Sequence, residues 1–537
     1  MNDRGEDGGS AMRRRFSTIL LVVAALSAPA AQSRDTLADR VDAIMARPEF
    51  KHASFGIEFY ALDTNSVVYE HNADGFFVPG STTKLVTMGS ALQLLGADYR
   101  FHTRVYRTGD VDADGTLHGD LVLVASGDPN LSGRIRPGET LAFENVDHSY
   151  GGPDSHGLDG DPLASVRELA AAVAAKGIRR IDGRVIVDAS LYTEGERDGG
   201  TGFVISPIII NDNAVDVVIR PGAAEQAPAV LDISPQTSYV AFANRVVTAA
   251  PGGETRVRVA SDVVSGDGTR RVTLTGTIPA DAQAIMSSYR VAEPSRFAEI
   301  VLAEALHERG VSASARRYED KVDAAALAHA NAPDRIVGEH VSPPFGEEVK
   351  VTLKVSQNLH ASATPYLLGA VVARKGTAAA GFAEIRKLLE TTGADVSGAS
   401  QSDGAGADAH FTPAFMVAYL AWLAKQPTAG VFHDALPTLG KDGTLWNVQT
   451  ASAAAGHVHA KTGTYQVRDL LHDRVMVTGK GLAGYMTTVD GRRLAFAIYA
   501  NNVEVKDGAS VTPIVGDALG AIAAAAYDTK LERRKRS

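Results

Sequence analysis

The stretch Pro79-Gly80-Ser81-Thr82-Thr83-Lys84-Leu85 decides the fold, because it sets a serine and a lysine three residues apart at the start of a predicted helix. The apolar residues that follow recur at the spacing of one helical face, and Gly96 provides a stop. The apolar positions are Leu85, Met88, Leu92 and Leu95. A spacing of three puts the Ser81 hydroxyl and the Lys84 amine one turn apart on the same face. A lysine so placed can take the proton of a serine, which is a weak nucleophile until a neighbour activates it.

Two further short motifs lie downstream in the chain. Ser356-Gln357-Asn358 fits the pattern S-x-N, and Lys461-Thr462-Gly463 fits K-T-G. With S-x-x-K they form, in this order, the signature set of serine enzymes that react with β-lactams. Alone, Ser356-Gln357-Asn358 is equally explained as a helix-capping segment, and Lys461-Thr462-Gly463 as a strand that leads into a turn. Together and in order, they indicate a site built around a nucleophilic serine.

The chain resembles the D-alanyl-D-alanine carboxypeptidase/endopeptidase family with a large insert, the low-molecular-mass class C penicillin-binding proteins of peptidase family S13. The resemblance extends beyond the three motifs to Phe77-Val78-Pro79-Gly80, Leu94 to Arg100, Gly127 to Leu131, Asn211-Asp212-Asn213, Asp442-Gly443-Thr444-Leu445 and Val458 to Thr464. It covers essentially the whole mature chain. It implies an α/β (α+β sandwich) structure, the serine β-lactamase/DD-peptidase-like transpeptidase fold, with a large β-rich insertion.

The resemblance also implies a function, which is that of a serine-type D-Ala-D-Ala carboxypeptidase, an endopeptidase, or both. Such an enzyme cleaves peptidoglycan stem peptides through an acyl-enzyme and is inhibited by β-lactam antibiotics that acylate it. Ser81 would attack the carbonyl between two D-alanines with Lys84 as the general base. Ser356 would relay a proton to the leaving amine, and Asn358 would hold Lys84 and the substrate amide.

The K-T-G segment and its neighbours would bind the substrate. Lys461 would raise the local positive potential and depress the Lys84 pKa, and with Thr462 and Thr464 it would bind the terminal carboxylate. Gly463 belongs to the same substrate-binding set. The backbone N–H groups of Ser81 and Thr464 would form the oxyanion hole. No cofactor and no metal is expected.

The sequence departs from the family pattern at two places. Where relatives read D-G-S-G-L-S-R, this chain has Asp403-Gly404-Ala405-Gly406-Ala407-Asp408-Ala409-His410, which puts recognition of the substrate side chain in doubt. An extra stretch, Tyr465 to Lys480, follows Thr464 beside the predicted cleft. It is equally interpreted as a lid or rim and as a plain surface loop.

The order of predicted elements indicates one domain split by an insertion. The separation of Lys84 from Ser356 exceeds the length of a single domain, about 50 to 250 residues. We predict a catalytic domain formed by residues 31–100 and 346–528 and a β-rich insert over residues 101–345, in two subdomains. The insert contains helices around Val166 to Lys176 and Phe297 to Glu308.

The N-terminus predicts export. Met12-Arg13-Arg14-Arg15 leads into an apolar run from Phe16 to Leu26 and then Ala28-Pro29-Ala30, the order of a secretory signal, so residues 1–30 are expected to be removed. A membrane anchor or a buried helix is the alternative. The expected location is the periplasm or cell envelope. The tail, residues 529–537, is basic; we expect it to be disordered, with peripheral contact to anionic lipid as the alternative.

Composition excludes several classes of function. Lys and Arg number 53 against 63 Asp and Glu, giving a formal net charge of -10 without a long basic stripe, so nucleic acid is not an expected partner. The chain has no cysteine, which excludes disulfides, thiolate metal sites and a cysteine nucleophile. His457 and His459 could form a metal pair, but no H-E-x-x-H motif accompanies them. No G-x-S-x-G elbow occurs, which argues against an α/β-hydrolase.

Two other functions compete with the DD-peptidase. A β-lactamase or esterase of the same fold would use the same chemistry, and a non-catalytic wall-binding scaffold would keep the fold without the reaction. The long insert and the three intact motifs favour the peptidase.

Overall fold

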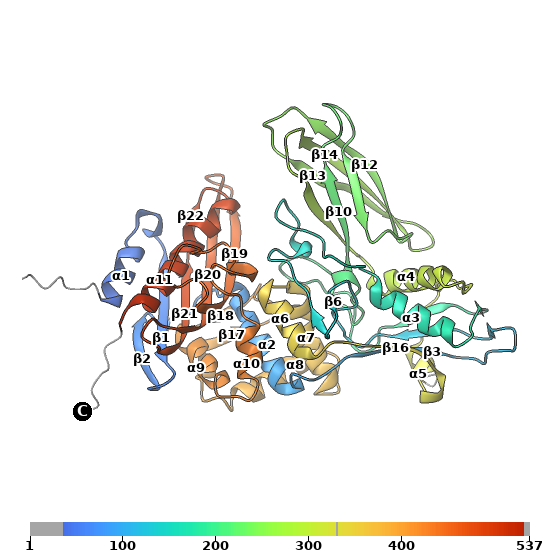
Figure 1. Cartoon of the computed structure of the whole chain (residues 1–537), viewed down its shortest axis with the longest axis horizontal. Helices are drawn as coiled ribbons and strands as arrows, with labels where there is room; N and C mark the ends of the chain where they lie inside the picture. Colours follow the sequence, from blue (N-terminus) through green and yellow to red (C-terminus); the bar gives the residue numbers. More distant parts are fainter. Residues whose placement is uncertain (1–35, 329–330, 531–537) are drawn as a thin grey trace, which may run out of the picture.

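The computed structural model describes residues 36–328 and 331–530 of the chain. The molecule is elongated, with a body of sheet and helices at one end and a β-rich part at the other (Figure 1). Both ends of the described chain lie on the first body. The predicted signal peptide, residues 1–30, lies outside the described residues, as do residues 531–537 of the predicted tail.

Six strands form the main sheet, in the order β19-β20-β21-β1-β2, with β22 paired to β20. They are β1 (Ser54–Ala61), β2 (Ser66–His71), β19 (Val458–Asp469), β20 (Arg474–Thr487), β21 (Arg493–Asn501) and β22 (Val503–Val505). β1 and β2 form an antiparallel hairpin. β1 also pairs antiparallel with β21, so the sheet joins segments from the two ends of the chain.

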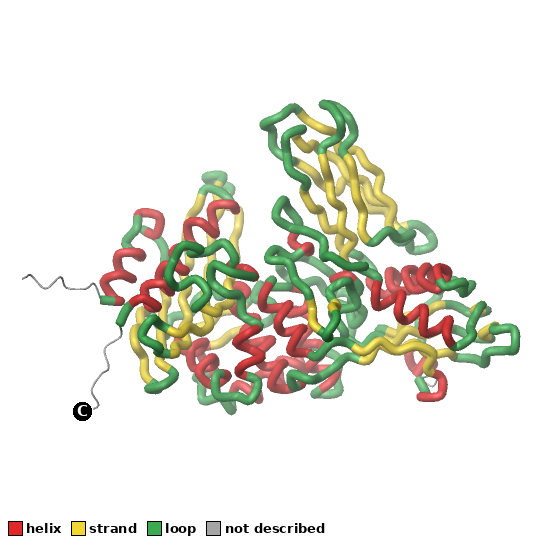
Figure 2. Tube along the Cα trace, viewed as in Figure 1, coloured by secondary structure: helices red, strands yellow, loops and turns green. Residues whose placement is uncertain are grey.

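Helices cover both faces of this sheet (Figure 2). On one face lie α1 (Leu37–Met45) and α11 (Asp517–Asp528); on the other lie α2 (Thr83–Leu95), α6 (Phe345–Lys354), α7 (Asn358–Val371), α8 (Ala378–Leu389), α9 (Pro413–Leu423) and α10 (Ala429–Asp434). β21 is buried on both of its faces. In β21, Phe496 packs in the core that contains α11, whereas Ala497 and Tyr499 pack in the core that contains α2 and α9.

The helix predicted from the Leu85 periodicity is confirmed as α2. It ends at Leu95, and Gly96 follows with a φ of 90°, a conformation in which glycine avoids the cost that a side chain would impose. Ser81 lies just before α2, in a single 3-10 turn formed by Gly80–Thr82. Ser81 therefore lies at the N-terminus of α2.

The last helical segment, Gly508–Asp528, is long and apolar enough to cross a membrane by length and composition alone. It includes the one-turn π-helix Thr512–Gly516 and α11. Ile522 and Ala523 of α11 are fully buried in the core beneath the main sheet. Packing in that core explains the apolar character of this helix.

A β-rich segment lies in the sequence between the two parts of this body. β3 (His102–Arg107) pairs antiparallel with β16 (Ile336–Val341), so the chain enters and leaves the insert on neighbouring strands. They belong to a four-stranded sheet in the order β16-β3-β5-β9, with β5 (Leu121–Val124) and β9 (Val185–Asp188). Two three-stranded sheets join β11 (Val230–Ser234), β10 (Ala214–Arg220) and β15 (Ile285–Arg290), and β12 (Val240–Ala249), β14 (Arg270–Pro279) and β13 (Arg256–Val264).

The remaining elements are short. Three two-stranded pairs are β4 (Thr116–Leu117) with β8 (Arg180–Ile181), β6 (Ile135–Arg136) with β7 (Thr140–Leu141), and β17 (Ala399–Gln401) with β18 (Ala409–Phe411). Both helices predicted in the insert are present, as α3 (Ala164–Ala175) and α4 (Pro294–Glu308), and α5 (Ala324–Ala328) adds one further turn.

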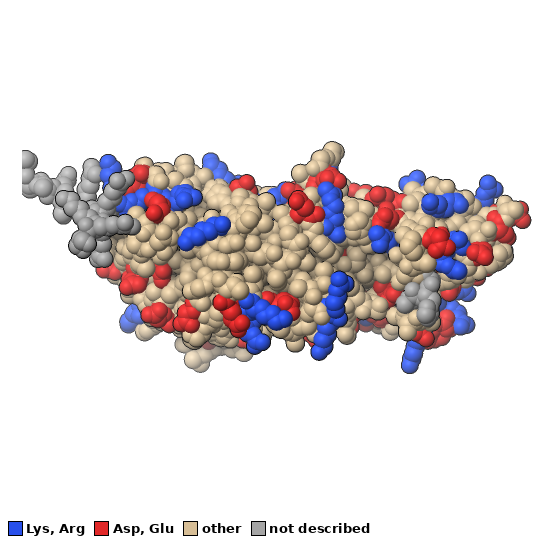
Figure 3. Space-filling model, turned by 90° about the horizontal axis from the view of Figure 1, so that it is seen from below, with Lys and Arg blue, Asp and Glu red and all other residues tan. Residues whose placement is uncertain are grey.

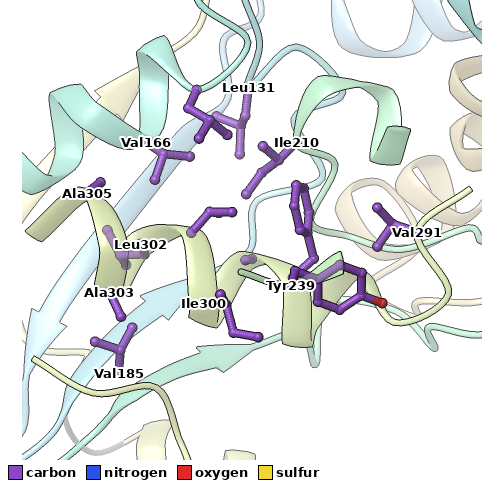
Figure 4. Close-up of a cluster of buried hydrophobic side chains, with 14 of the residues drawn as sticks. Leu131, Val166, Val185, Ile210, Tyr239, Val291, Ile300, Leu302, Ala303 and Ala305 are labelled. Carbon is purple, nitrogen blue, oxygen red and sulfur yellow. The ribbon is translucent and has the colours of Figure 1, made fainter. Parts of the chain in front are cut away.

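The core of the insert forms around α3 and α4. Figure 4 shows Leu302 and Ala303 of α4 close to Val185 of β9 and to Val166 of α3. Tyr239, just before β12, extends the same buried cluster toward the β12–β14 sheet, which projects from the molecule (Figures 1 and 4). The insert therefore has a hydrophobic core of its own.

Charge is dispersed on the face seen in Figure 3, where Lys and Arg alternate with Asp and Glu over a largely uncharged surface. A binding surface for a polyanion needs a continuous basic patch. This face shows none among the described residues.

Candidate active site

Ser81 and Lys84 meet as the sequence predicts. The 3-10 turn and the first turn of α2 place the Lys84 Nζ 2.7 Å from the Ser81 Oγ. Ser81 lines an open cleft, whereas Lys84 is fully buried beneath it. The Ser81 hydroxyl is therefore accessible to a ligand, whereas the Lys84 amine is shielded from water.

Three more oxygen atoms surround the Lys84 amine. Asn358 Oδ1 lies at 2.6 Å, Ser356 Oγ at 3.3 Å and the carbonyl oxygen of Ala405 at 3.3 Å. Burial lowers the pKa of Lys84 to about 7, and the nearby carboxylates of Asp403 and Asp198 act in the opposite direction. Near neutral pH a substantial fraction of Lys84 is thus unprotonated and able to accept a proton.

The S-x-N motif lies between α6 and α7. Ser356 has a φ of 62°, an unusual conformation for a residue with a side chain, and such strain persists only when neighbours hold it. Tyr150, from the insert, donates its hydroxyl to the carbonyl oxygen of Ser356 at 2.5 Å. Gln357 accepts from the backbone N–H of Leu359 at 2.8 Å and so caps α7, which begins at Asn358.

The K-T-G motif lies on β19, and its side chains point in two directions. Thr462 and Thr464 line the cleft, and the Thr462 Oγ1 lies 2.7 Å from the Thr444 Oγ1. Lys461 is fully buried behind them and donates to the carbonyl oxygen of Thr462 at 2.9 Å. Burial, together with the charges of Lys84 and Lys480, holds the pKa of Lys461 well below its usual range.

Gly80 and Gly463 let the serine turn and β19 approach each other closely. Gly80 has a φ of 51°, and a Cβ built on it would lie 2.5 Å from the backbone nitrogen of Thr464. A Cβ on Gly463 would lie 3.0 Å from the backbone nitrogen of Ser81 and would collide with the Pro79 carbonyl. The two nitrogens predicted to form the oxyanion hole therefore lie on facing segments.

The cleft has a volume of about 740 Å³. Ser81, Ser356, Asn358, Thr462 and Thr464 line it, so five of the eight predicted site residues share one cavity, while Lys84, Lys461 and Gly463 lie behind its wall. Side chains and backbone from the insert complete the lining at Tyr150, Gly199 and Gly200.

Sequence reasoning did not find several residues of this site. Thr444 lies in the Asp442-Gly443-Thr444-Leu445 segment, whose family resemblance was a usable signal. Tyr150 and Lys480 carry no such signal, because their positions depend on the insert and on the register of β20.

The loop that departs from the family pattern still closes over the lysine. Asp403 accepts from the backbone N–H groups of Ala405 at 2.7 Å and Gly406 at 2.6 Å. This turn directs the Ala405 carbonyl at Lys84. The loop lacks the serine and the arginine of the family pattern, but the contact between the Ala405 carbonyl and Lys84 is still present.

The extra stretch after Thr464 extends β19 and β20 into a long hairpin. Tyr465, Gln466 and Lys480 of this hairpin line the cleft. Leu470 and Leu471 at its tip are 80% and 83% exposed. The base of the hairpin is therefore a rim of the cleft.

A buried charge network supports α7 from the insert. Asp212 accepts from Arg134 at 2.5 Å, from His148 at 2.6 Å and from His360 at 2.7 Å. Burial opposes ionisation of Asp212, but the charges of Arg134 and His360 outweigh it and hold its pKa well below the usual range. His360 lies two residues after Asn358 in α7, so the network holds the helix that carries Asn358.

The predicted histidine pair is divided between two packing environments. His457 stacks on Tyr527 with ring centroids 5.2 Å apart, and His459 lies tilted against His433 with ring centroids 4.2 Å apart. Asp147, His148 and Asp212 are close enough to hold a cation, but Arg134 already donates to both aspartates.

Comparison with known proteins gives a family match over residues 37–519, to the model described as "D-Ala-D-Ala carboxypeptidase 3 (S13) family". The chain is 27% identical over 486 residues to a D-alanyl-D-alanine carboxypeptidase of Actinomadura sp. (strain R39), covering 87% of this chain and 81% of that protein.

Two solved structures of penicillin binding protein 4 (dacB) from Haemophilus influenzae share the fold. One has a TM-score of 0.68 at 19% identity and covers 89% of this chain and 98% of that one. The other, complexed with a novel β-lactam, has a TM-score of 0.66 at 18% identity and covers 91% and 100%. The predicted fold class is confirmed.

Proposed function

Because this chain belongs to the D-Ala-D-Ala carboxypeptidase 3 (S13) family, we propose that Ser81 is its nucleophile and Lys84 the general base. Membership of this family identifies the chain as a serine-type D-Ala-D-Ala carboxypeptidase, which is a hydrolase. The predicted enzyme class is confirmed. The observation that carries the residue assignment is the 2.7 Å contact between the buried Lys84 amine and the Ser81 hydroxyl.

In the proposed acylation, Lys84 takes the hydroxyl proton while Ser81 Oγ attacks the carbonyl carbon between two D-alanines. The negative charge that develops on the carbonyl oxygen is stabilised by the backbone N–H groups of Ser81 and Thr464. When the C–N bond breaks, the amine leaves with a proton that passes from Lys84 through Ser356. The close approach of these groups supports this assignment.

Water then completes the cycle. Lys84, again unprotonated, takes a proton from water, whose oxygen attacks the ester carbon, and the Ser81 oxygen leaves and regains a proton. Asn358 holds Lys84 through its Oδ1 and presents its amide nitrogen toward the cleft side of Gly200. Thr462, Thr464 and the Gly463 backbone bind the terminal carboxylate, with Lys461 adding positive potential from behind β19.

We assign peptidoglycan stem peptides as the substrate and β-lactams as acylating inhibitors. A protein of the same fold, penicillin binding protein 4 from Haemophilus influenzae, has been solved in complex with a β-lactam, which supports the assignment of β-lactams as inhibitors. The predicted signal peptide supports export to the cell envelope. Contact of the basic tail with anionic lipid stays a subsidiary proposal.

We also propose the division into domains predicted from the sequence. Two buried clusters unite residues 37–101 with residues 345–527, and a third lies almost entirely within residues 105–337. These clusters support a discontinuous catalytic domain and an inserted one. Within the insert, the projecting β12–β14 sheet is the second subdomain.

Labelling with a fluorescent penicillin tests the assignment of Ser81. The wild type should be labelled covalently, and peptide mapping should place the label on Ser81. Ser81→Ala should abolish labelling, while Ser402→Ala, at an exposed serine outside the cleft, should leave it unchanged. Label on another residue in the Ser81→Ala variant would refute the assignment, and release of hydrolysed penicillin within seconds would favour the β-lactamase.

A further inference from the structure

Lys480 is a third lysine at the cleft, next to the threonines of the K-T-G strand. It lies on β20 directly opposite Thr464 of β19, so the two side chains emerge on the same face of the sheet. Its Nζ donates to the Thr464 Oγ1 at 2.7 Å, and its stem packs beside Gly516. Only 6% of the residue is exposed, yet it lines the cleft that contains Ser81.

No carboxylate of the described residues lies within ion-pair distance of this ammonium group. The titratable groups near it are Lys461, whose pKa the charge of Lys480 lowers, and Tyr465, which lines the same cleft, while the π-helix contributes Thr512 and Gly516. Burial lowers the pKa of Lys480 to about 8, so it is still mainly charged at neutral pH. A buried cation without a counter-ion is costly, which points to an anion supplied from outside.

We propose that Lys480 makes the cleft selective for ligands with a carboxylate beside the scissile bond, acting through Thr464. The inference rests on the proposed function of Ser81. The Thr464 hydroxyl has one hydrogen, and because Lys480 already donates to its oxygen, that hydrogen is free to be donated to an anion. The terminal carboxylate of a D-alanyl peptide and the carboxylate of penicillin both meet this requirement.

The test compares acylation by benzylpenicillin with acylation by its methyl ester, which lacks the negative charge. We expect the wild type to prefer the acid and Lys480→Met to reduce that preference about tenfold or more, mainly through slower acylation by the acid. The rate with the ester should stay within about twofold of wild type, since loss of one charge-assisted contact affects only the acid. Lys506→Met, which removes an exposed lysine, is the charge-matched control.

The pH dependence separates this role from a structural one. The acid-to-ester ratio cancels the titration of Lys84, because that group acts on both ligands. In the wild type the ratio should fall as the pH rises through about 8, where Lys480 loses its proton, and in Lys480→Met this fall near pH 8 should be absent. The variant should unfold at an equal or higher temperature at pH 7, because a lysine with a lowered pKa costs stability below that pKa.

Each outcome decides the inference. A smaller ratio with an unchanged ester rate supports it. An unchanged ratio in Lys480→Met overturns it while leaving Ser81 as the nucleophile, and equal loss with both ligands assigns Lys480 a structural role instead. A wild type that neither ligand acylates overturns the inference together with the proposed function.

Discussion

The hydroxyl of Tyr150 donates a 2.5 Å hydrogen bond to the carbonyl oxygen of Ser356, so the insert contacts the S-x-N motif directly. Ser356 has a positive φ of 62° and needs neighbours to hold it there. The insert is thus part of the machinery that shapes the cleft.

Tyr150→Phe should slow acylation by penicillin roughly fivefold, because a net hydrogen bond contributes about 1 kcal/mol. The rate is measured by stopped-flow labelling at several penicillin concentrations. Tyr465→Phe is the control, since Tyr465 lines the same cleft but its hydroxyl makes no hydrogen bond within the described residues. Equal rates for wild type and Tyr150→Phe would show that the contact does not support Ser356.

The pKa of Lys84 sets the pH profile of the reaction. Lys84 must be neutral to accept a proton, so kcat/KM should rise with pH and level off above about 7. Asp403→Asn removes a negative charge that raises the pKa of Lys84, and the rising limb should therefore move to lower pH. Asp408→Asn, on the same loop, should leave the limb in place. A shift of the Asp403→Asn profile toward higher pH would contradict this electrostatic account.

Gly80→Ala should reduce acylation by on the order of a hundredfold, which is the effect of losing an oxyanion-hole donor. The added Cβ would push β19 and its Thr464 nitrogen away from the serine turn. Gly96→Ala is the matched control, because Gly96 also has a positive φ but a Cβ there meets no atom within 4 Å. Comparable loss of labelling in both variants would point to backbone strain in place of the collision at the cleft.

Asp212→Asn should destabilise the protein by about 3 kcal/mol, because it removes the carboxylate that Arg134 and two buried histidines share, although Arg134 keeps its contact with Asp147. Thermal unfolding of full-length protein measures the effect. Asp182→Asn, at a surface ion pair with His118, should change the unfolding temperature little. Similar unfolding temperatures for the wild type and Asp212→Asn would show that the network is dispensable.

The same network predicts how stability varies with pH. Burial opposes protonation of His360, but Glu348 and Asp212 outweigh it and raise its pKa to about 10. A raised pKa adds stability that is full below the unfolded pKa of about 6.5 and is lost as the pH rises toward 10. The wild type should therefore lose stability over this range, and Asp212→Asn should lose less. Opposite slopes would contradict the assignment of charge in the network.

Local patterns were sufficient to predict the elements that build the site. The apolar periodicity from Leu85 to Leu95 predicted the extent of α2. The spacing from Ser81 to Lys84 predicted the contact between their side chains. Both predictions succeed because they depend only on helix geometry. The turn between β20 and β21 contains Asp490-Gly491, a dipeptide that is typical of two-residue hairpin turns.

Features that depend on distant parts of the chain were not predictable. β21 is buried on both faces because helices remote in sequence cover each one, which no alternation within the strand reveals. Lys461 donates to its neighbour's carbonyl behind the strand, and Tyr150 reaches Ser356 from the insert. Such contacts follow from how the insert and β19 pack on the body.

Digestion of defined muropeptides tests the central claim most directly. Purified mature protein is incubated with a monomeric pentapeptide and with a cross-linked dimer, and the products are followed by mass spectrometry with and without penicillin. Loss of D-alanine from the pentapeptide, or splitting of the dimer, should occur with wild type, stop with penicillin and be absent in Ser81→Ala. No cleavage of either substrate by a folded wild type would contradict the account.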